Sequence, residues 1–139
     1  MRPLTVQGRA IAERLAAALE TRHCRFDAIL CSPLLRARQT AEPLKRLLAE
    51  ATSQFAICEA LASGHHDPDA VCGAIAELGV ERIAVVGHLP DIAELAGYLL
   101  GIAGGAVEFE WGTAAFFECG SSLRAGHAAL DWLITPEWY

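Results

Sequence analysis

The chain has 139 residues, 53% of them hydrophobic, and a formal net charge of −6 from 17 acidic and 11 basic residues. This length and apolar content predict one globular domain spanning residues 1–139 and exclude a disordered chain. The acidic balance argues against a general nucleic-acid or anionic-membrane surface, so an anion site has to be a local cationic pocket.

The five cysteines are odd in number and have no C-x-x-C spacing, which indicates buried thiols in a reducing compartment rather than disulfides or a zinc site. The N-terminus has no apolar signal segment. The longest uncharged run, residues 95–107, is 13 residues long and contains four glycines, too short and too broken to span a bilayer. We therefore expect a cytoplasmic protein with no membrane partner.

The first half of the chain reads as helix, strand, helix. Thr5 is placed to cap a helix that runs to about Thr21. The apolar run 26–30 predicts a buried strand, and Ser32-Pro33 directly after it predicts a helix with Ser32 as N-cap and proline at its first position. Pro43 interrupts that helix, so we expect a kink or a restart capped near Thr40.

The second half continues this alternation and then changes. Asp67-Pro68 predicts a helix start and Gly79 its end. Further predicted elements are strands over 55–58, 83–86, 107–111, 114–119 and 128–134 and a helix over 91–100 that ends at Gly101. The run 83–86 is apolar on both faces, as in a central parallel strand. The order predicts an α/β fold, mainly parallel with an antiparallel edge.

Two strand ends carry the candidate chemistry. Arg36 lies just after the Ser32-Pro33 helix start, and Gly87-His88 follows the strand 83–86 directly. If these strands are parallel neighbours, Arg36 and His88 converge on one pocket that suits phosphoryl transfer. The alternatives are a solvated arginine on a helix face and a histidine that only caps a turn.

Three motifs then resemble one family, in order and spacing. They are Arg2-Pro3-Leu4-Thr5-x-x-Gly8, Ser32-Pro33-x-x-Arg36-Ala37-x-Gln39-Thr40 and Gly87-His88-x-Pro90. Together they resemble the histidine phosphatase (phosphoglycerate mutase-like) superfamily, and most of all its small SixA-type phosphohistidine phosphatases. The resemblance implies a three-layer α/β/α sandwich that needs no metal and no cofactor.

The same resemblance implies roles for four residues. Arg36 would bind phosphate, His88 would be the second active-site histidine that holds the phosphoryl oxygens, and Ser32 and the Leu89 amide would be weaker phosphate contacts. The implied substrate is a phosphohistidine-bearing protein or a small phosphomonoester, with no nucleic acid as partner. The implied reaction passes through a phosphohistidine enzyme intermediate.

One family element has no counterpart. The nucleophilic histidine ends a central strand in Arg-His-Gly that should precede Arg2, so we expect this first strand to be missing. His23 and His127 lie in ordinary turns and do not replace it, and His65-His66 lack a third metal ligand. Whether this chain is an enzyme is left open, and the alternative is a pseudophosphatase that binds phosphate or a phosphoprotein without turnover.

Overall fold

The computed structural model describes residues 2–50, 53–62, 64, 67–102 and 107–139. In chain order its elements are α1 (Val6–Thr21), β1 (Ala28–Cys31), α2 (Leu35–Ala41), a 3-10 helix (Glu42–Leu47), β2 (Gln54–Ile57), a 3-10 turn (Glu59–Leu61), α3 (Pro68–Leu78), β3 (Ile83–Val86), α4 (Asp91–Leu100), β4 (Ala114–Cys119), β5 (Ala128–Ile134) and a 3-10 turn (Pro136–Trp138). Among these described residues, no helix combines the length and apolarity needed to cross a membrane.

Helix ends follow the local capping signals. The Thr5 side chain accepts a hydrogen bond from the backbone amide three residues on, and Asp67 does the same at the start of α3. Gly79 and Gly101 close α3 and α4 with φ values of 63° and 72°, in the left-handed region that glycine adopts without steric cost. The predicted boundaries of these helices are therefore confirmed.

The strand β1 forms the middle of a parallel three-stranded sheet of order β2-β1-β3. Leu30 lies opposite Ala56 on one side and opposite Val85 on the other. The prediction that 83–86 is the central strand is wrong within the described residues, because β3 pairs only with β1. Burial agrees with this order, since all four residues of β1 are buried but only Val86 of β3 is.

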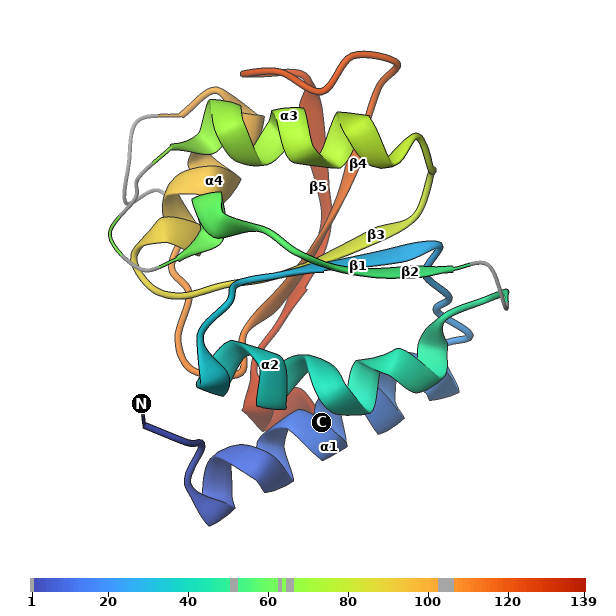
Figure 1. Ribbon diagram of the computed structural model, residues 1–139, viewed down its shortest axis with the longest axis vertical. Helices are drawn as coiled ribbons and strands as arrows, with labels where there is room; N and C mark the ends of the chain where they lie inside the picture. Colours follow the sequence, from blue (N-terminus) through green and yellow to red (C-terminus); the bar gives the residue numbers. More distant parts are fainter. Residues whose placement is uncertain (1, 51–52, 63, 65–66, 103–106) are drawn as a thin grey trace.

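Helices cover both faces of this sheet (Figure 1). On the face of α1 and α2, Ile29 and Cys31 pack with Leu15, Leu19 and Leu47. On the other face, the alternate residue Leu30 packs with side chains of α3 and α4, among them Val71, Leu95 and Leu99. The period-2 alternation of β1 thus divides the core into two halves, and the predicted three-layer α/β/α sandwich is confirmed.

The strands β4 and β5 form an antiparallel pair with a register shift between Phe116 and Phe117. The predicted strand over 107–111 is wrong. Glu110 and Thr113 instead exchange hydrogen bonds across a turn, with Gly112 at φ 79°. The Trp111 ring lies against α1, so close to Gly8 that a Cβ there would be 2.5 Å from the ring. A tertiary contact therefore overrides the alternating pattern.

No ladder joins β3 to β4 among the residues the structure describes. The parallel sheet and the antiparallel pair are consequently two separate hydrogen-bonded units. One edge of β3 and one edge of β4 lack a strand partner in the described part of the chain, which leaves backbone groups available for pairing at each edge.

Candidate functional site

The carboxyl ends of β1 and β3 lie side by side. Cys31 is opposite Val86, and the Ser32 amide donates a 2.9 Å hydrogen bond to the Val86 carbonyl oxygen. The pairing therefore continues one residue beyond β1. It brings Ser32 next to the Gly87-His88 segment, at the sheet edge where ligand sites of parallel α/β folds form.

Ser32 is completely buried and its hydroxyl contacts His88. The distance from Ser32 Oγ to His88 Nε2 is 2.7 Å, and the Leu34 amide donates to the same Oγ at 3.2 Å. The predicted site residues Ser32 and His88, 56 positions apart, are thus in direct contact. The serine hydroxyl reaches the imidazole here, whereas the resemblance implied a contact to phosphate.

The helix after Ser32 starts two residues later than predicted. α2 begins at Leu35 with Leu34 as its N-cap, and the Leu34 side chain makes no capping hydrogen bond. Ser32 cannot serve as N-cap because its backbone continues the pairing of β1. Pro43 does end the helix: α2 stops at Ala41 and the 3-10 helix follows. The predicted restart is found, with Ala41 rather than Thr40 itself as the N-cap of the 3-10 helix, and the Thr40 hydroxyl donates back to the Arg36 carbonyl oxygen at 2.9 Å.

Arg36 in the first turn of α2 acts on His88 through its charge. Burial lowers the pKa of the His88 imidazole, the Arg36 guanidinium lowers it further, and the Asp91 carboxylate opposes both. Because the ordinary pKa of histidine is already below 7, these effects keep His88 neutral at neutral pH. A fixed cation beside a neutral imidazole can hold a phosphoryl group with little repulsion between the two side chains.

Asp91 was not among the predicted site residues. It is the first residue of α4, only 9% exposed, and its Oδ2 accepts a 3.0 Å hydrogen bond from the Gly64 amide. It therefore ties the Gly64 amide to the same sheet edge. An acidic residue just after His-x-Pro at a helix start was the available sequence signal. Leu89, whose amide was a predicted contact, is 46% exposed beside this site.

The other histidines do not reach this edge in the described structure. His23 lies in the turn after α1, and His127 accepts a 3.2 Å hydrogen bond from Arg124. Gly126, next to His127, packs near Gly101 at the end of α4 opposite to His88. His65 and His66 lie outside the described residues. Within the described part, no three His, Cys, Asp or Glu side chains are placed to hold a metal ion.

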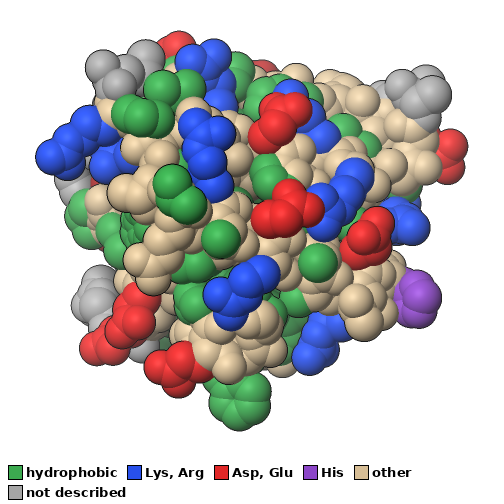
Figure 2. Space-filling model, turned by 90° about the horizontal axis from the view of Figure 1, so that it is seen from below, with side chains coloured by type: hydrophobic (Ala, Val, Ile, Leu, Met, Phe, Trp, Pro, Cys, Tyr) green, Lys and Arg blue, Asp and Glu red, His purple; other side chains and the backbone are tan. Residues whose placement is uncertain are grey.

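The surface over α1 and α2 is neither uniformly positive nor uniformly negative. Figure 2 shows this face from below, with Lys and Arg side chains interspersed among Asp and Glu. Pairs such as Lys45–Glu42, at 2.9 Å, and Arg46–Glu13 account for part of this mixture. A cationic binding site on this acidic chain is therefore local, as Arg36 is, rather than spread over a face.

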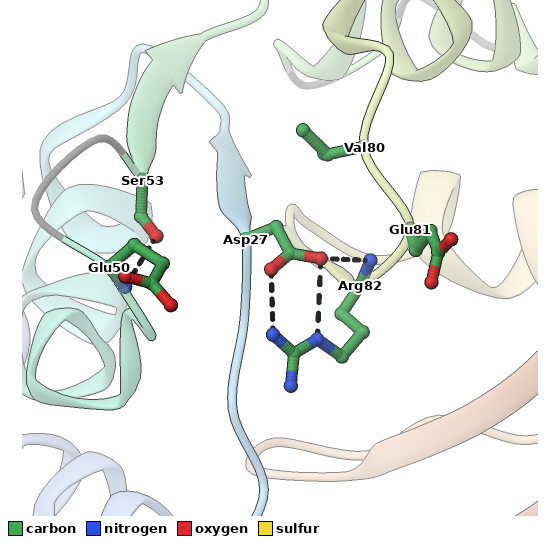
Figure 3. Close-up of a pocket in the computed structure, with 6 residues that line it drawn as sticks. All are labelled: Asp27, Glu50, Ser53, Val80, Glu81 and Arg82. Carbon is green, nitrogen blue, oxygen red and sulfur yellow. Dashed lines mark hydrogen bonds and ion pairs between the residues drawn. The ribbon is translucent and has the colours of Figure 1, made fainter.

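A polar hollow lies at the opposite, amino end of the sheet (Figure 3). It has a volume of about 410 Å³ and is lined by Asp27, Glu50, Ser53, Val80, Glu81 and Arg82. Its main feature is an ion pair in which Arg82 Nη2 and Nε donate to Asp27 at 2.8 and 3.3 Å, and the Arg82 amide adds a third bond at 2.9 Å. These bonds join the start of β1 to the segment before β3, so this hollow has a structural explanation.

The ion pair predicts a contribution to stability that depends on pH. Hydrogen bonds from the Arg82 side chain and amide lower the pKa of the Asp27 carboxyl. A carboxyl with a lowered folded-state pKa adds stability above its ordinary pKa and loses it as the pH falls through the folded-state value. Unfolding by urea between about pH 5 and pH 2 should therefore show a steeper loss of stability in the wild type than in Asp27→Asn. Arg82→Gln should also flatten the profile. Identical profiles for all three proteins would contradict this reading.

Three comparisons with known proteins bear on this site. Residues 2–62 match the family model of the histidine phosphatase superfamily, branch 1. An uncharacterized protein of Picosynechococcus sp. is 35% identical over 106 residues, in an alignment that covers 68% of this chain. The aligned region covers 58% of that relative, so the chain spans less than two thirds of its length.

Solved structures share the fold across almost the whole chain. The protein histidine phosphatase SixA, in a structure complexed with tungstate, superposes with a TM-score of 0.81 at 26% identity, covering 98% of this chain and 85% of that one. A protein assigned as a phosphohistidine phosphatase SixA of Nakamurella multipartitia superposes with a TM-score of 0.80 at 24% identity, covering 97% of this chain and 85% of that one. The second likeness concerns the fold alone.

Proposed function

We propose that this chain belongs to the histidine phosphatase superfamily, whose family model matches residues 2–62, and that it carries the phosphate-holding part of a phosphohistidine phosphatase of the SixA type. One observation supports this proposal above the others. The ends of β1 and β3 bring Ser32 and His88 into contact, and Arg36 is close enough to perturb the imidazole electrostatically. The proposed substrates are phosphohistidine-bearing proteins or small phosphomonoesters.

The proposed reaction has two displacements at phosphorus. A nucleophilic imidazole attacks the phosphohistidine in line, a new P–N bond forms as the substrate P–N bond breaks, and the departing imidazole takes a proton from solvent. Water then attacks the phosphorus of the enzyme intermediate, which releases inorganic phosphate and restores the histidine. Arg36 and His88 hold the non-bridging oxygens during both steps, so their contribution is positioning and charge stabilisation.

The nucleophile would come from a strand added to the free edge of β3. Parallel strands end at the same sheet edge, so a strand lying parallel to β3 would place its last residues beside His88. Of the three histidines in the described residues, His23 and His127 lie away from this edge. Within the described part of the chain, His88 is therefore the histidine that would hold phosphate. An added strand would supply the nucleophilic histidine.

The second candidate function is phosphate or phosphoprotein binding without turnover. The same cluster favours it, because an arginine and a neutral imidazole suffice to bind a phosphoryl group. The two functions differ in whether a second imidazole reaches phosphorus, and a direct assay separates them.

Phosphohistidine hydrolysis by two chains tests the proposal. We expect residues 1–139 to bind inorganic phosphate, measured by calorimetry, without releasing phosphate from phosphohistidine. We expect a hybrid with a strand ending in Arg-His-Gly fused before Met1 to release it, and the same hybrid with the histidine of that strand replaced by alanine to be inactive. The hybrid's activity depends on the added strand adopting the position beside β3.

Three outcomes would count against the proposal. Turnover by residues 1–139 that disappears in Arg36→Ala would show that another group is the nucleophile. A folded hybrid that binds phosphate and gives no turnover would favour the binding function. Absence of phosphate binding by every form would remove both candidates.

A further inference from the structure

The His88 imidazole has two ring nitrogens, and within the described part of the chain a hydrogen bond reaches one of them, Nε2. Nε2 lies 2.7 Å from the Oγ of Ser32, a residue that is completely buried. In a neutral imidazole one nitrogen carries the proton and the other accepts, and the partner of one nitrogen decides the state of the other. The direction of the hydrogen bond between the Ser32 hydroxyl and Nε2 therefore determines whether Nδ1 donates or accepts.

The Ser32 hydroxyl carries one hydrogen and can therefore donate one hydrogen bond. Its oxygen already accepts from the Leu34 amide at 3.2 Å. If Nε2 carried the ring proton, it would donate to the same oxygen, and the hydroxyl hydrogen would need another acceptor inside a site with no solvent exposure. The bonds found for this hydroxyl in the described structure are those to Leu34 and His88. Donation from Ser32 to Nε2 satisfies both the buried hydroxyl and Nε2, whereas the reverse leaves the buried hydroxyl hydrogen unpaired.

We propose that Ser32 is a positioning residue: its buried hydroxyl donates to Nε2 of His88 and holds the neutral imidazole as the Nδ1–H tautomer. His88 then offers Nδ1–H as a hydrogen-bond donor on the side of the ring away from Ser32. On the phosphatase proposal, on which the functional part of this inference rests, that donor is directed to a phosphoryl oxygen. The chain of donors runs from the Leu34 amide through Ser32 to His88.

The charges around His88 agree with this assignment. Arg36 on α2 and burial both disfavour the imidazolium, and Asp91 on α4 opposes them. A hydrogen bond donated to Nε2 stabilises the neutral ring in the same direction, because the charged ring has no acceptor nitrogen. Ser32 directly after β1, Arg36 on α2 and Asp91 on α4 are thus polar groups from three parts of the fold that together set the state of His88.

Nitrogen-15 spectra of the histidine side chains test the tautomer directly. In the uniformly labelled wild-type chain at neutral pH, we expect a protonated Nδ1 and an unprotonated Nε2 for His88, identified by the signals lost in His88→Gln. In Ser32→Ala we expect a mixture of tautomers and a higher His88 pKa in a pH titration, since the donor that favours the neutral ring is gone. In Ser32→Thr, which keeps the hydroxyl, the wild-type tautomer should return.

Ser53→Ala is the matched control. Ser53 accepts a 3.0 Å hydrogen bond from the Glu50 amide and lines the hollow at the opposite end of the sheet. Its loss should leave the tautomer and the pKa of His88 unchanged. Backbone amide spectra of every variant establish that the fold is kept, and the wild-type measurement itself requires no variant.

The inference is overturned if wild-type His88 carries its proton on Nε2, or if Ser32→Ala leaves both tautomer and pKa unchanged or lowers the pKa. These readouts do not depend on catalysis. A protein that shows the Nδ1–H tautomer and fails to bind inorganic phosphate would keep the positioning role of Ser32 and contradict the proposed function. A protein that binds inorganic phosphate and lacks the Nδ1–H tautomer would contradict the positioning role of Ser32 and keep the proposed function.

Discussion

Replacing Arg36 by alanine is expected to weaken the binding of inorganic phosphate about 10- to 100-fold. A hydrogen bond to a charged group contributes about 1.5–3 kcal/mol, and each factor of ten in affinity corresponds to about 1.4 kcal/mol. Arg36 is half-buried beside His88, where its field reaches the imidazole, so the loss should fall near the full value. Calorimetry at fixed pH and ionic strength measures the effect.

Arg38→Ala provides the control for this experiment. Arg38 is exposed on the same helix, two residues on, and lines a separate hollow with Phe55 and Ile57 at the outer edge of β2. Both variants remove one positive charge from the same acidic chain. We expect Arg38→Ala to bind phosphate within about twofold of wild type, since exposed charges are screened by salt. Equal losses of phosphate affinity in both variants would show that Arg36 contributes only its general positive charge and no specific contact to phosphate.

Replacing Ile29 by alanine is expected to cost about 2–5 kcal/mol of unfolding free energy. Ile29 has no exposed surface and lies in the middle strand, within the core half shared with α1 and α2. Removing its outer methyl groups leaves a cavity that the surrounding helices and strands cannot close without moving. Urea unfolding followed by circular dichroism measures the change.

Ile57→Ala makes the same chemical change at the edge of the sheet. Ile57 ends β2 and is 44% exposed, so its truncation should cost about 1 kcal/mol or less. A large difference between the two variants follows from β1 being the central strand. Similar costs would show that the parallel sheet does not bury β1 more deeply than β2.

Several parts of the fold were predictable because their causes are local. The Thr5 and Asp67 caps each satisfy a backbone amide three residues on, and Gly79 ends its helix through its own backbone conformation. Such interactions depend on a few neighbouring residues and are therefore visible in the sequence. The strands 83–86, 114–119 and 128–134 were also predicted with their observed boundaries.

Strand order and the contacts of the site depended on residues far apart in the chain. Residues 28–31 and 83–86 are both short apolar runs, and only their pairing shows that the first lies in the centre. The 107–111 segment alternates like a strand, yet the Trp111 ring packs against Gly8. In the same way, the motifs identified Ser32, Arg36 and His88 as candidates, and their spacing carried no information on which atoms meet.

The sequence by itself therefore determined the ends of α1, α3 and α4, the α/β alternation and the candidate residues Ser32, Arg36 and His88, because capping, periodicity and motif chemistry act over a few residues. Only the tertiary structure decided that β1 is central and that β3 and β4 are not joined within the described chain. It also decided that the Ser32 hydroxyl lies within hydrogen-bonding distance of the His88 imidazole. The physical reason is that pairing, burial and side-chain hydrogen bonds are set by partners brought together only when the whole chain folds.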